Sequence, residues 1–120
     1  GGLMVIPHPK EVLEIMKSIP YGKVLSLDEI RAKLAREHAA DIACPMTTGM
    51  FVVLAAHAYE EGDDSVPYWR TLKKHGELNA KFPGGIEAHK KKLESEGHTV
   101  YAKRKTLFMS NWEVNIEPNG

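Results

Sequence analysis

Apolar residues recur with the period of a helix along the first half of the chain. Between residues 9 and 19 they fall at i, i+3, i+4 and i+7 behind a proline that suits a first helical turn, which predicts a helix over about residues 9–18 (Pro9, Val12, Ile15, Met16, Ile19). A second helix is predicted from Ser26 to about Glu37, because Ser26 and Glu29 have the spacing of a capping box. Its buried face would consist of Leu27, Ile30 and Leu34.

The third predicted helix runs from a cap at Thr47 or Thr48 to Tyr59. Its residues are apolar on almost every side, which indicates a buried helix. Residues 38–46 are interpreted as the connection before it, and residues 60–65 as an acidic turn after it. Two helices joined in this way suggest a helix-turn-helix unit.

Beyond residue 65 the pattern changes to extended runs, turns and one further helix. Residues 66–70 are predicted to be extended, and residues 73–76 to form a turn. A helix from Ile86 to Glu96 would end at Gly97, and two strand-like runs, 98–102 and 106–110, predict a hairpin around a basic turn. We therefore predict an α+β, mostly helical fold: a winged helix-turn-helix domain with a small C-terminal β hairpin.

Length and composition indicate one domain. A chain of 120 residues with 42% hydrophobic side chains can bury one core. We assign residues 9–116 to this domain and residues 1–8 to a disordered N-terminus or the remnant of an expression tag. Because no apolar run approaches the roughly 20 residues of a membrane span, and the single cysteine, Cys44, fits a reducing compartment, we expect a cytoplasmic protein with no membrane partner.

Charge is balanced over the whole chain but not along it. Residues 1–67 carry six basic and ten acidic side chains, whereas residues 68–107 carry ten basic and four acidic ones. The formal net charge of zero argues against a general electrostatic attraction to nucleic acid. The second half would bind a polyanion or simply present solvated lysines.

The residues that usually carry metal or cofactor chemistry lack the required spacing. The six histidines form no HxxxH or HExxH pattern, and Cys44 has no CxxC partner. Gly84-Gly85 is not followed by the Lys-Ser/Thr of a phosphate-binding loop. We therefore expect no metal and no cofactor, and we interpret Cys44 as a packing thiol.

Several short segments occur in an order that is typical of a known family. They are Ile19 to Ser26, a helix pair, Val66-Pro67-Tyr68-Trp69-Arg70, Gly76-Glu77-Leu78, Pro83-Gly84-Gly85-Ile86 and Leu93 to His98. In this order and spacing the chain resembles the DNA-binding domain of O6-alkylguanine-DNA alkyltransferases over about residues 9 to 110. It is most similar to the alkyltransferase-like proteins, which lack the acceptor cysteine. The resemblance implies binding of double-stranded DNA and recognition of alkylated guanine, in DNA repair, without transfer of the alkyl group.

The resemblance places Tyr68 where active alkyltransferases have the acceptor cysteine of a Pro-Cys-His-Arg motif, and Trp69 in place of its histidine. A phenol, whose ordinary pKa is about 10, is a poor substitute for a thiolate, and an indole cannot relay a proton. We therefore expect no enzymatic alkyl transfer. Tyr68 and Trp69 would either stack on a base in a pocket, worth about 1–3 kcal/mol per base, or pack the wing onto the helices.

Four further residues complete the candidate base pocket through the resemblance. Pro83, Gly84 and Gly85 correspond to the family loop that borders the pocket, although the same residues also suit a turn that begins a helix. Arg70 corresponds to the arginine that the family retains, and a structural hydrogen-bonding role for it is equally open.

Two departures from the family count against lesion recognition. Leu27 stands where family members have a tyrosine that contacts the phosphate of the flipped nucleotide, and no arginine occurs early in the third helix to fill the gap in the base stack. Phe51 or Met50 would be an apolar substitute. The other candidate DNA-binding residues are Thr47, Thr48, Lys73 and Lys74.

Three functions are therefore compatible with the sequence. The first is a non-catalytic alkyltransferase-like DNA-binding protein that recognises O6-alkylguanine. The alternative is a winged-helix interaction module that binds a protein or small ligand rather than DNA, as the apolar third helix suggests. The third is an enzyme of unrelated chemistry in the same pocket.

Overall fold

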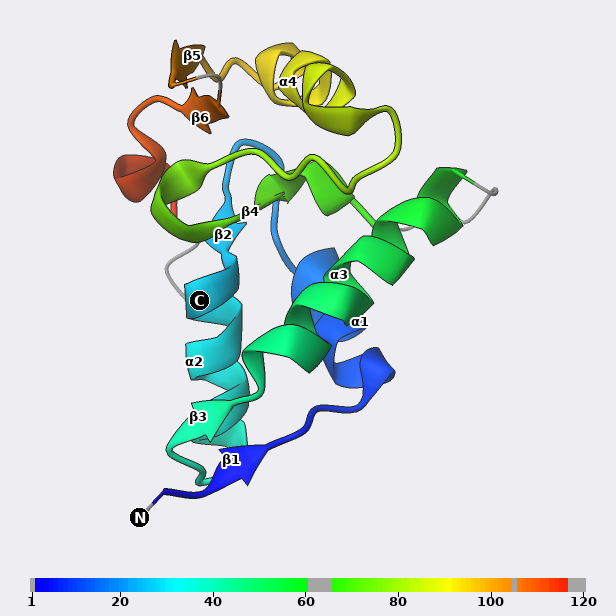
Figure 1. Ribbon diagram of the computed structural model, residues 1–120, viewed down its shortest axis with the longest axis vertical. Coiled ribbons are helices and arrows are strands. Elements are labelled where there is room, and N and C mark those ends of the chain that lie inside the picture. The colour runs from blue at the N-terminus through cyan, green and yellow to red at the C-terminus, as the bar shows by residue number, and fades with distance from the viewer. Residues whose placement is uncertain (1, 61–65, 105, 117–120) are drawn as a thin grey trace.

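Three helices from the first half of the chain enclose the larger of two hydrophobic cores. The computed structural model describes residues 2–60, 66–104 and 106–116. Helices α1 (Pro9–Lys17), α2 (Leu27–Glu37) and α3 (Pro45–Glu60) contact one another in the lower part of Figure 1. They bury a common set of apolar side chains: Val12, Ile15, Met16, Ile30, Leu34 and Val52. Burial of one such side chain stabilises the fold by about 1.5–3 kcal/mol.

Helices α1 and α2 both begin with reciprocal capping bonds. Ser26 Oγ accepts the Glu29 N–H at 3.3 Å, and Glu29 Oε1 accepts the Ser26 N–H at 2.7 Å. The equivalent pair at the start of α1 is His8 and Glu11, whose Oε1 accepts the His8 N–H at 2.9 Å. The predicted Ser26–Glu29 capping box is confirmed, and the predicted spans of both helices agree with the structure to within about one residue.

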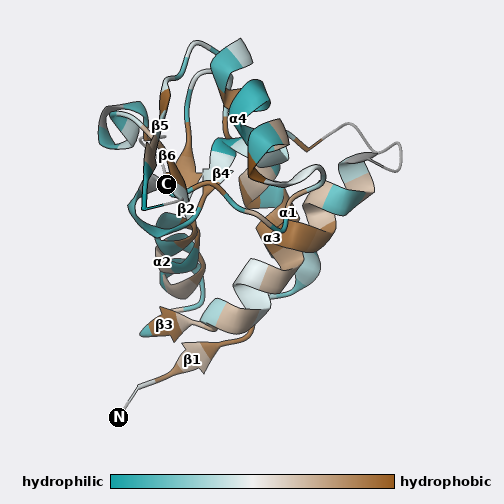
Figure 2. Cartoon of the chain, turned by 45° about the horizontal axis from the view of Figure 1, so that its top comes forward, coloured by the Kyte–Doolittle hydropathy of each residue, from teal (hydrophilic) through white to brown (hydrophobic). Residues whose placement is uncertain are grey.

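Helix α3 differs from its prediction in two respects. It begins at Pro45, two residues before the first expected cap, because the fixed φ of proline suits the first helical position. It is also not buried on every side. Met46, Met50 and Leu54 are 82%, 52% and 57% exposed, and their spacing of four residues places them in one stripe along the helix. Figure 2 shows α3 brown or pale over much of its length, so hydropathy alone does not reveal which of its faces is covered.

The second half of the chain forms a smaller core at the other end of the molecule. Helix α4 (Gly85–Ser95) and the antiparallel hairpin of β5 (Val100–Lys103) and β6 (Thr106–Met109) close over it (Val24, Leu72, Leu78, Leu93, Met109). Strand β2 (Leu25–Ser26) pairs in parallel with β4 (Thr71–Leu72), and this pairing joins the two halves near the middle of Figure 1. The predicted fourth helix and the predicted hairpin are confirmed, as is the mostly helical α+β fold class.

Two segments differ from the sequence-based expectation. Residues 66–70 are not fully extended, because Tyr68–Arg70 form the 3₁₀ turn η1, in which the Arg70 N–H donates to Pro67 O at 3.1 Å. Met4–Val5, within the N-terminal segment expected to be disordered, form strand β1 in parallel with β3 (Ile42–Ala43). The paired residues are 38 positions apart in the sequence, so no local pattern predicts this pairing.

Parts of two predicted turns, residues 61–65 and Lys105, lie outside the described residues. The predicted turn at residues 73–76 corresponds to the short 3₁₀ helix η2 (Lys74–Gly76). In the part of the chain that the structure describes, no helix has the length and apolarity needed to cross a membrane.

Candidate nucleic-acid interface

Tyr68 lies at the centre of an aromatic cluster. Its side chain is 1% exposed, and the rings of Tyr59, Trp69 and Phe82 approach it edge-on with centroid distances of 5.2, 5.3 and 5.1 Å. These rings come from α3, η1 and the segment before α4. Each such aromatic pair adds about 0.5–1.5 kcal/mol to the burial energy. Of the two roles considered for Tyr68, this geometry is that of packing the two halves together.

Trp69 and Arg70 both bind the carboxylate of Glu96. Trp69 Nε1–H donates to Glu96 Oε2 at 2.7 Å, and the Arg70 guanidinium donates to the same carboxylate and to Ile19 O. Burial alone would raise the pKa of the Glu96 carboxyl, but the hydrogen bonds from Arg70, Trp69 and the Gly22 N–H outweigh it and hold the pKa below its ordinary value. The polar groups of both residues therefore already have partners within the protein.

The Pro83-Gly84-Gly85 segment begins α4. Gly84 is the residue before the helix and has a φ of 79°, and a Cβ placed on it would lie 2.6 Å from Ala88 Cβ. Gly85 has a φ of 73° with no atom near its missing side chain. Glycine is needed here to form the turn, which is the structural option considered for this segment.

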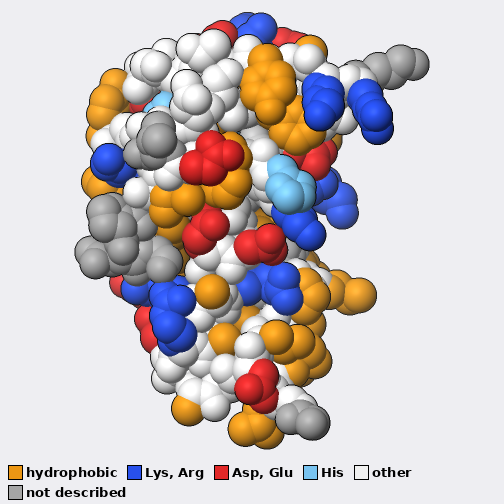
Figure 3. Space-filling model, turned by 90° about the vertical axis from the view of Figure 1, so that its left-hand side faces the viewer, with side chains coloured by type: hydrophobic (Ala, Val, Ile, Leu, Met, Phe, Trp, Pro, Cys, Tyr) orange, Lys and Arg blue, Asp and Glu red, His pale blue; other side chains and the backbone are white. Residues whose placement is uncertain are grey.

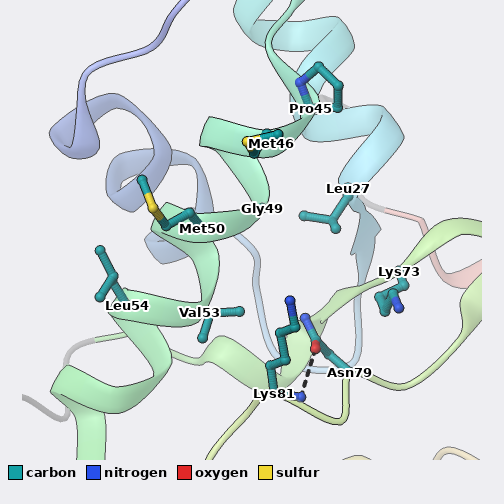
Figure 4. Close-up of a pocket in the computed structure, with 10 residues that line it drawn as sticks. All are labelled: Leu27, Pro45, Met46, Gly49, Met50, Val53, Leu54, Lys73, Asn79 and Lys81. Carbon is teal, nitrogen blue, oxygen red and sulfur yellow. Dashed lines mark hydrogen bonds between the residues drawn. The ribbon is translucent and has the colours of Figure 1, made fainter.

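An open groove lies instead between α3 and the segment 73–81. Its volume is about 510 Å³, within the range of about 300–1,000 Å³ typical of ligand sites. The lining residues are Leu27, Pro45, Met46, Gly49, Met50, Val53, Leu54, Lys73, Asn79 and Lys81. Figure 4 shows the α3 side chains along one wall, Lys81 and Asn79 opposite, and Leu27 and Val53 pointing toward the space between.

The groove combines an apolar wall with two lysines. Neither aspartate nor glutamate occurs among its lining residues. Lys81 is exposed, and Lys73 Nζ lies 3.9 Å from Glu77 Oε2. The face drawn in Figure 3 has acidic and basic side chains interspersed, with hydrophobic side chains projecting along one edge. That face therefore carries no continuous basic surface.

Asn79 is one of the groove residues that the sequence analysis missed. It is 6% exposed, its N–H donates to His89 Nδ1 at 3.1 Å, and its Oδ1 accepts the Lys81 N–H at 3.0 Å. The opposite nitrogen, His89 Nε2, lies 2.9 Å from Trp69 O. Burial lowers the pKa of His89 to about 4, so the neutral ring donates through Nε2 and accepts through Nδ1. No pattern around Asn79 signals this arrangement, because its partner His89 is ten residues away.

The remaining candidate residues are divided between the core and the surface. Thr48 is fully buried and its hydroxyl donates to Cys44 O at 2.7 Å, while Thr47 donates to Cys44 Sγ at 3.2 Å. The latter bond lowers the pKa of the Cys44 thiol below its ordinary value.

Phe51 packs against the larger core, whereas Lys74 is exposed and lies beside Asp28 and Arg31, away from the groove. Among the candidates, Lys73 lines the groove, together with Met50 and Leu27.

Within the described residues, no three His, Cys, Asp or Glu side chains come together in a cluster that would hold a metal ion. The polar side chains of the groove are lysines and an asparagine amide, which are hydrogen-bond donors at the atoms that face outward. The site therefore suits a ligand that carries acceptors, negative charge and an apolar part.

Two solved structures share this fold. The crystal structure of S. pombe ATL in complex with DNA is 22% identical, with a TM-score of 0.68. That of S. pombe Atl1 in complex with damaged DNA containing O6-carboxymethylguanine is 21% identical, with a TM-score of 0.65. Each alignment covers 91% of this chain and 93% of the other chain. A comparison with curated protein sequences gave no match.

The family comparison covers most of the chain. The model for the 6-O-methylguanine DNA methyltransferase, DNA binding domain, matches residues 7–98, which include α1 to α4 and both walls of the groove. On this match, the chain belongs to the family of the 6-O-methylguanine DNA methyltransferase DNA-binding domain.

Proposed function

We propose that this chain binds duplex DNA and recognises O6-alkylguanine without transferring the alkyl group. Membership of the family supports DNA binding, and the two structures that share its fold contain DNA, one of them with an O6-carboxymethylguanine lesion. The observation that carries the proposal is the groove of about 510 Å³ beside α3, which has an apolar wall and lysines on its other side.

The groove has the properties that an extruded alkylated base requires. Val53 and Leu27 provide an apolar floor for the base and its alkyl group, and Lys73 and Lys81 are placed to neutralise phosphates. Flipping a base costs a few kcal/mol and needs compensation. The exposed stripe of Met46, Met50 and Leu54 would supply it by inserting an apolar side chain at the opened base step. Met50 therefore takes the role for which the family uses an arginine.

The side chains at the positions where the resemblance puts the reaction centre do not support alkyl transfer. Tyr68, at the position of the acceptor cysteine, is packed among three aromatic rings, and Trp69 donates its only polar hydrogen to Glu96. The one thiol, Cys44, precedes α3 and is not among the residues that line the groove. An alkyl group bound in the groove would therefore meet no thiolate acceptor, and the protein would hold the lesion unchanged.

Fluorescence anisotropy with plain and O6-methylguanine duplexes at two salt concentrations tests the proposal. We expect tighter binding of the lesion duplex and a steep dependence on salt. Lys81→Gln should lower the slope of log K against log salt by about one. Lys17→Gln, which removes an exposed charge at the end of α1, is the matched control and should leave affinity and slope nearly unchanged.

Two results would contradict the proposal. Equal affinity for the plain and lesion duplexes would remove lesion recognition. Absence of binding to either duplex at physiological salt would remove DNA binding and favour an interaction module for another ligand.

A further inference from the structure

The groove contains one buried side-chain donor, on Asn79, that has no partner among the described residues. Asn79 is only 6% exposed, and its Oδ1 already accepts a hydrogen bond from the Lys81 N–H. Because a backbone N–H needs an acceptor, this bond identifies the oxygen of the amide and leaves Nδ2 at the other end. No residue in the described part of the chain accepts a hydrogen bond from Nδ2. Figure 4 shows this nitrogen directed toward the space between Val53 and Leu27.

The position of this donor is fixed from two sides. The Asn79 N–H is held by His89 Nδ1 at 3.1 Å, and the side-chain oxygen by Lys81 N at 3.0 Å. His89 is in turn held by Trp69 O and is itself fully buried. The Nδ2 group is thus oriented before any ligand arrives, which lowers the entropy cost of a bond to it.

The groove offers donors but no side-chain acceptor to a ligand. Its other lining side chains are apolar except for Lys73 and Lys81, which only donate. A ligand edge that carries an N–H would lose its hydrogen bond to water here without a replacement, and such unsatisfied groups are costly. A ring nitrogen that carries no hydrogen would accept a bond from Asn79 Nδ2 and avoid this penalty at that position.

This property separates unmodified from alkylated guanine. Guanine carries a hydrogen on N1, which is a donor. Alkylation at O6 fixes the ring in the form without that hydrogen, so N1 becomes an acceptor. The alkyl group itself lies beside N1 and would need an apolar neighbour, which Val53 and Leu27 provide.

We propose that Asn79 is the specificity-determining residue of the groove, and that its Nδ2 donates a hydrogen bond to the unprotonated N1 of O6-alkylguanine. The inference rests on the proposed function, because it requires a base to enter the groove. It adds the atom by which the protein distinguishes the lesion from normal guanine.

The test compares three bases at one position of the same duplex, each opposite thymine: guanine, O6-methylguanine and 1-methylguanine. The last two are isomers, but the methyl group of 1-methylguanine occupies N1 and removes the acceptor. The wild-type protein should bind the O6-methylguanine duplex several-fold more tightly than either of the others. Loss of one hydrogen bond corresponds to about a two- to tenfold change in affinity.

Asn79→Asp is the discriminating variant, because it keeps an oxygen for the Lys81 N–H and replaces the donor with an acceptor. The ratio of affinities for O6-methylguanine and guanine should fall by about tenfold or reverse. The added negative charge weakens binding of every duplex, and this effect cancels in the ratio. Lys73→Gln changes the charge of the groove by the same amount and should leave the ratio within about twofold of wild type.

The outcomes separate the two proposals. If the wild-type protein shows no preference for O6-methylguanine, the proposed function fails and the role of Asn79 with it. If the preference exists but persists in Asn79→Asp, or if wild type binds 1-methylguanine as tightly as O6-methylguanine, the proposed function stands and the role of Asn79 is overturned. The second comparison needs no variant, so it decides the question even if Asn79→Asp does not fold.

Discussion

The guanidinium of Arg70 forms a buried, two-pronged ion pair with the carboxylate of Glu96. Arg70 Nε and Nη2 lie 3.0 and 2.8 Å from Glu96 Oε2, and the two side chains are only 14% and 3% exposed. Arg70 Nη1 also donates to Ile19 O at 2.8 Å. The pair therefore connects η1, the end of α4 and the segment after α1. Arg70 has a structural position in this fold and is not among the residues that line the groove.

Removing Glu96 should destabilise the protein strongly. In Glu96→Ala the Arg70 charge stays buried without its partner, and the Trp69 Nε1–H loses its acceptor. We expect the free energy of unfolding to fall by about 3–5 kcal/mol, measured by urea denaturation. Glu94→Ala, an exposed glutamate of the same helix, is the control and should change it by less than about 0.5 kcal/mol. A similar loss of unfolding free energy in both variants would show that the ion pair does not stabilise the fold more than an exposed glutamate does.

Introducing a cysteine at position 68 should not produce alkyl transfer. Tyr68→Cys would place the thiol in a closed aromatic cluster beside Trp69, which cannot deprotonate it. After incubation with an O6-methylguanine duplex, intact-protein mass spectrometry should show no added methyl group in the wild type or in Tyr68→Cys. A methylated fraction in the wild type would contradict the non-catalytic assignment.

Stability should decline as the pH falls through the range of His89. Burial lowers its pKa from 6.5 to about 4 in the folded protein, so between these values the unfolded chain binds the proton and the folded chain does not. Stability from this residue is therefore complete above about pH 6.5 and is lost toward pH 4, by up to about 3 kcal/mol.

Urea denaturation between pH 7 and pH 4 measures this effect. His89→Gln, although less stable overall, should give a flatter pH dependence than wild type. The slope should not vanish, because burial also lowers the pKa of His98. His75→Asn is the control, since His75 is exposed and asparagine tolerates its φ of 62°. An unchanged slope in His89→Gln would contradict the prediction.

The two glycines at the start of α4 should respond differently to alanine. Both have positive φ, which costs a side chain about 1–2 kcal/mol. Only at Gly84 would the new Cβ also meet Ala88, at 2.6 Å, whereas nothing lies within 4 Å at Gly85. Gly84→Ala should therefore lower the melting temperature clearly more than Gly85→Ala. Equal shifts would mean that the backbone turn, rather than the contact with Ala88, determines both effects.

The elements that were predicted correctly are those that depend on neighbouring residues. The Ser26–Glu29 capping box, the end of α4 just before Gly97 and the β5–β6 hairpin each follow from residues within a few positions. The short parallel pairings β1–β3 and β2–β4 were not predicted, because their partners are about 40 residues apart. Such pairings depend on packing of the whole chain rather than on local propensity.

The candidate site was predicted only in part for the same reason. Lys73, Leu27 and Met50 were each singled out along the chain, but the groove that unites them forms where α3 meets a segment about 30 residues later. The burial and orientation of Asn79 could not be predicted, since His89, which accepts its N–H, lies ten residues further along the chain.

The order of helices, the hairpin and the family resemblance all followed from the amino acids themselves, because caps, periodicity and residue chemistry act locally. The covered face of α3, the burial of Tyr68 and the direction of the Asn79 donor followed from the packed fold. These properties depend on which side chains, far apart in the sequence, exclude water from one another. Those contacts form only when the two halves of the chain pack together.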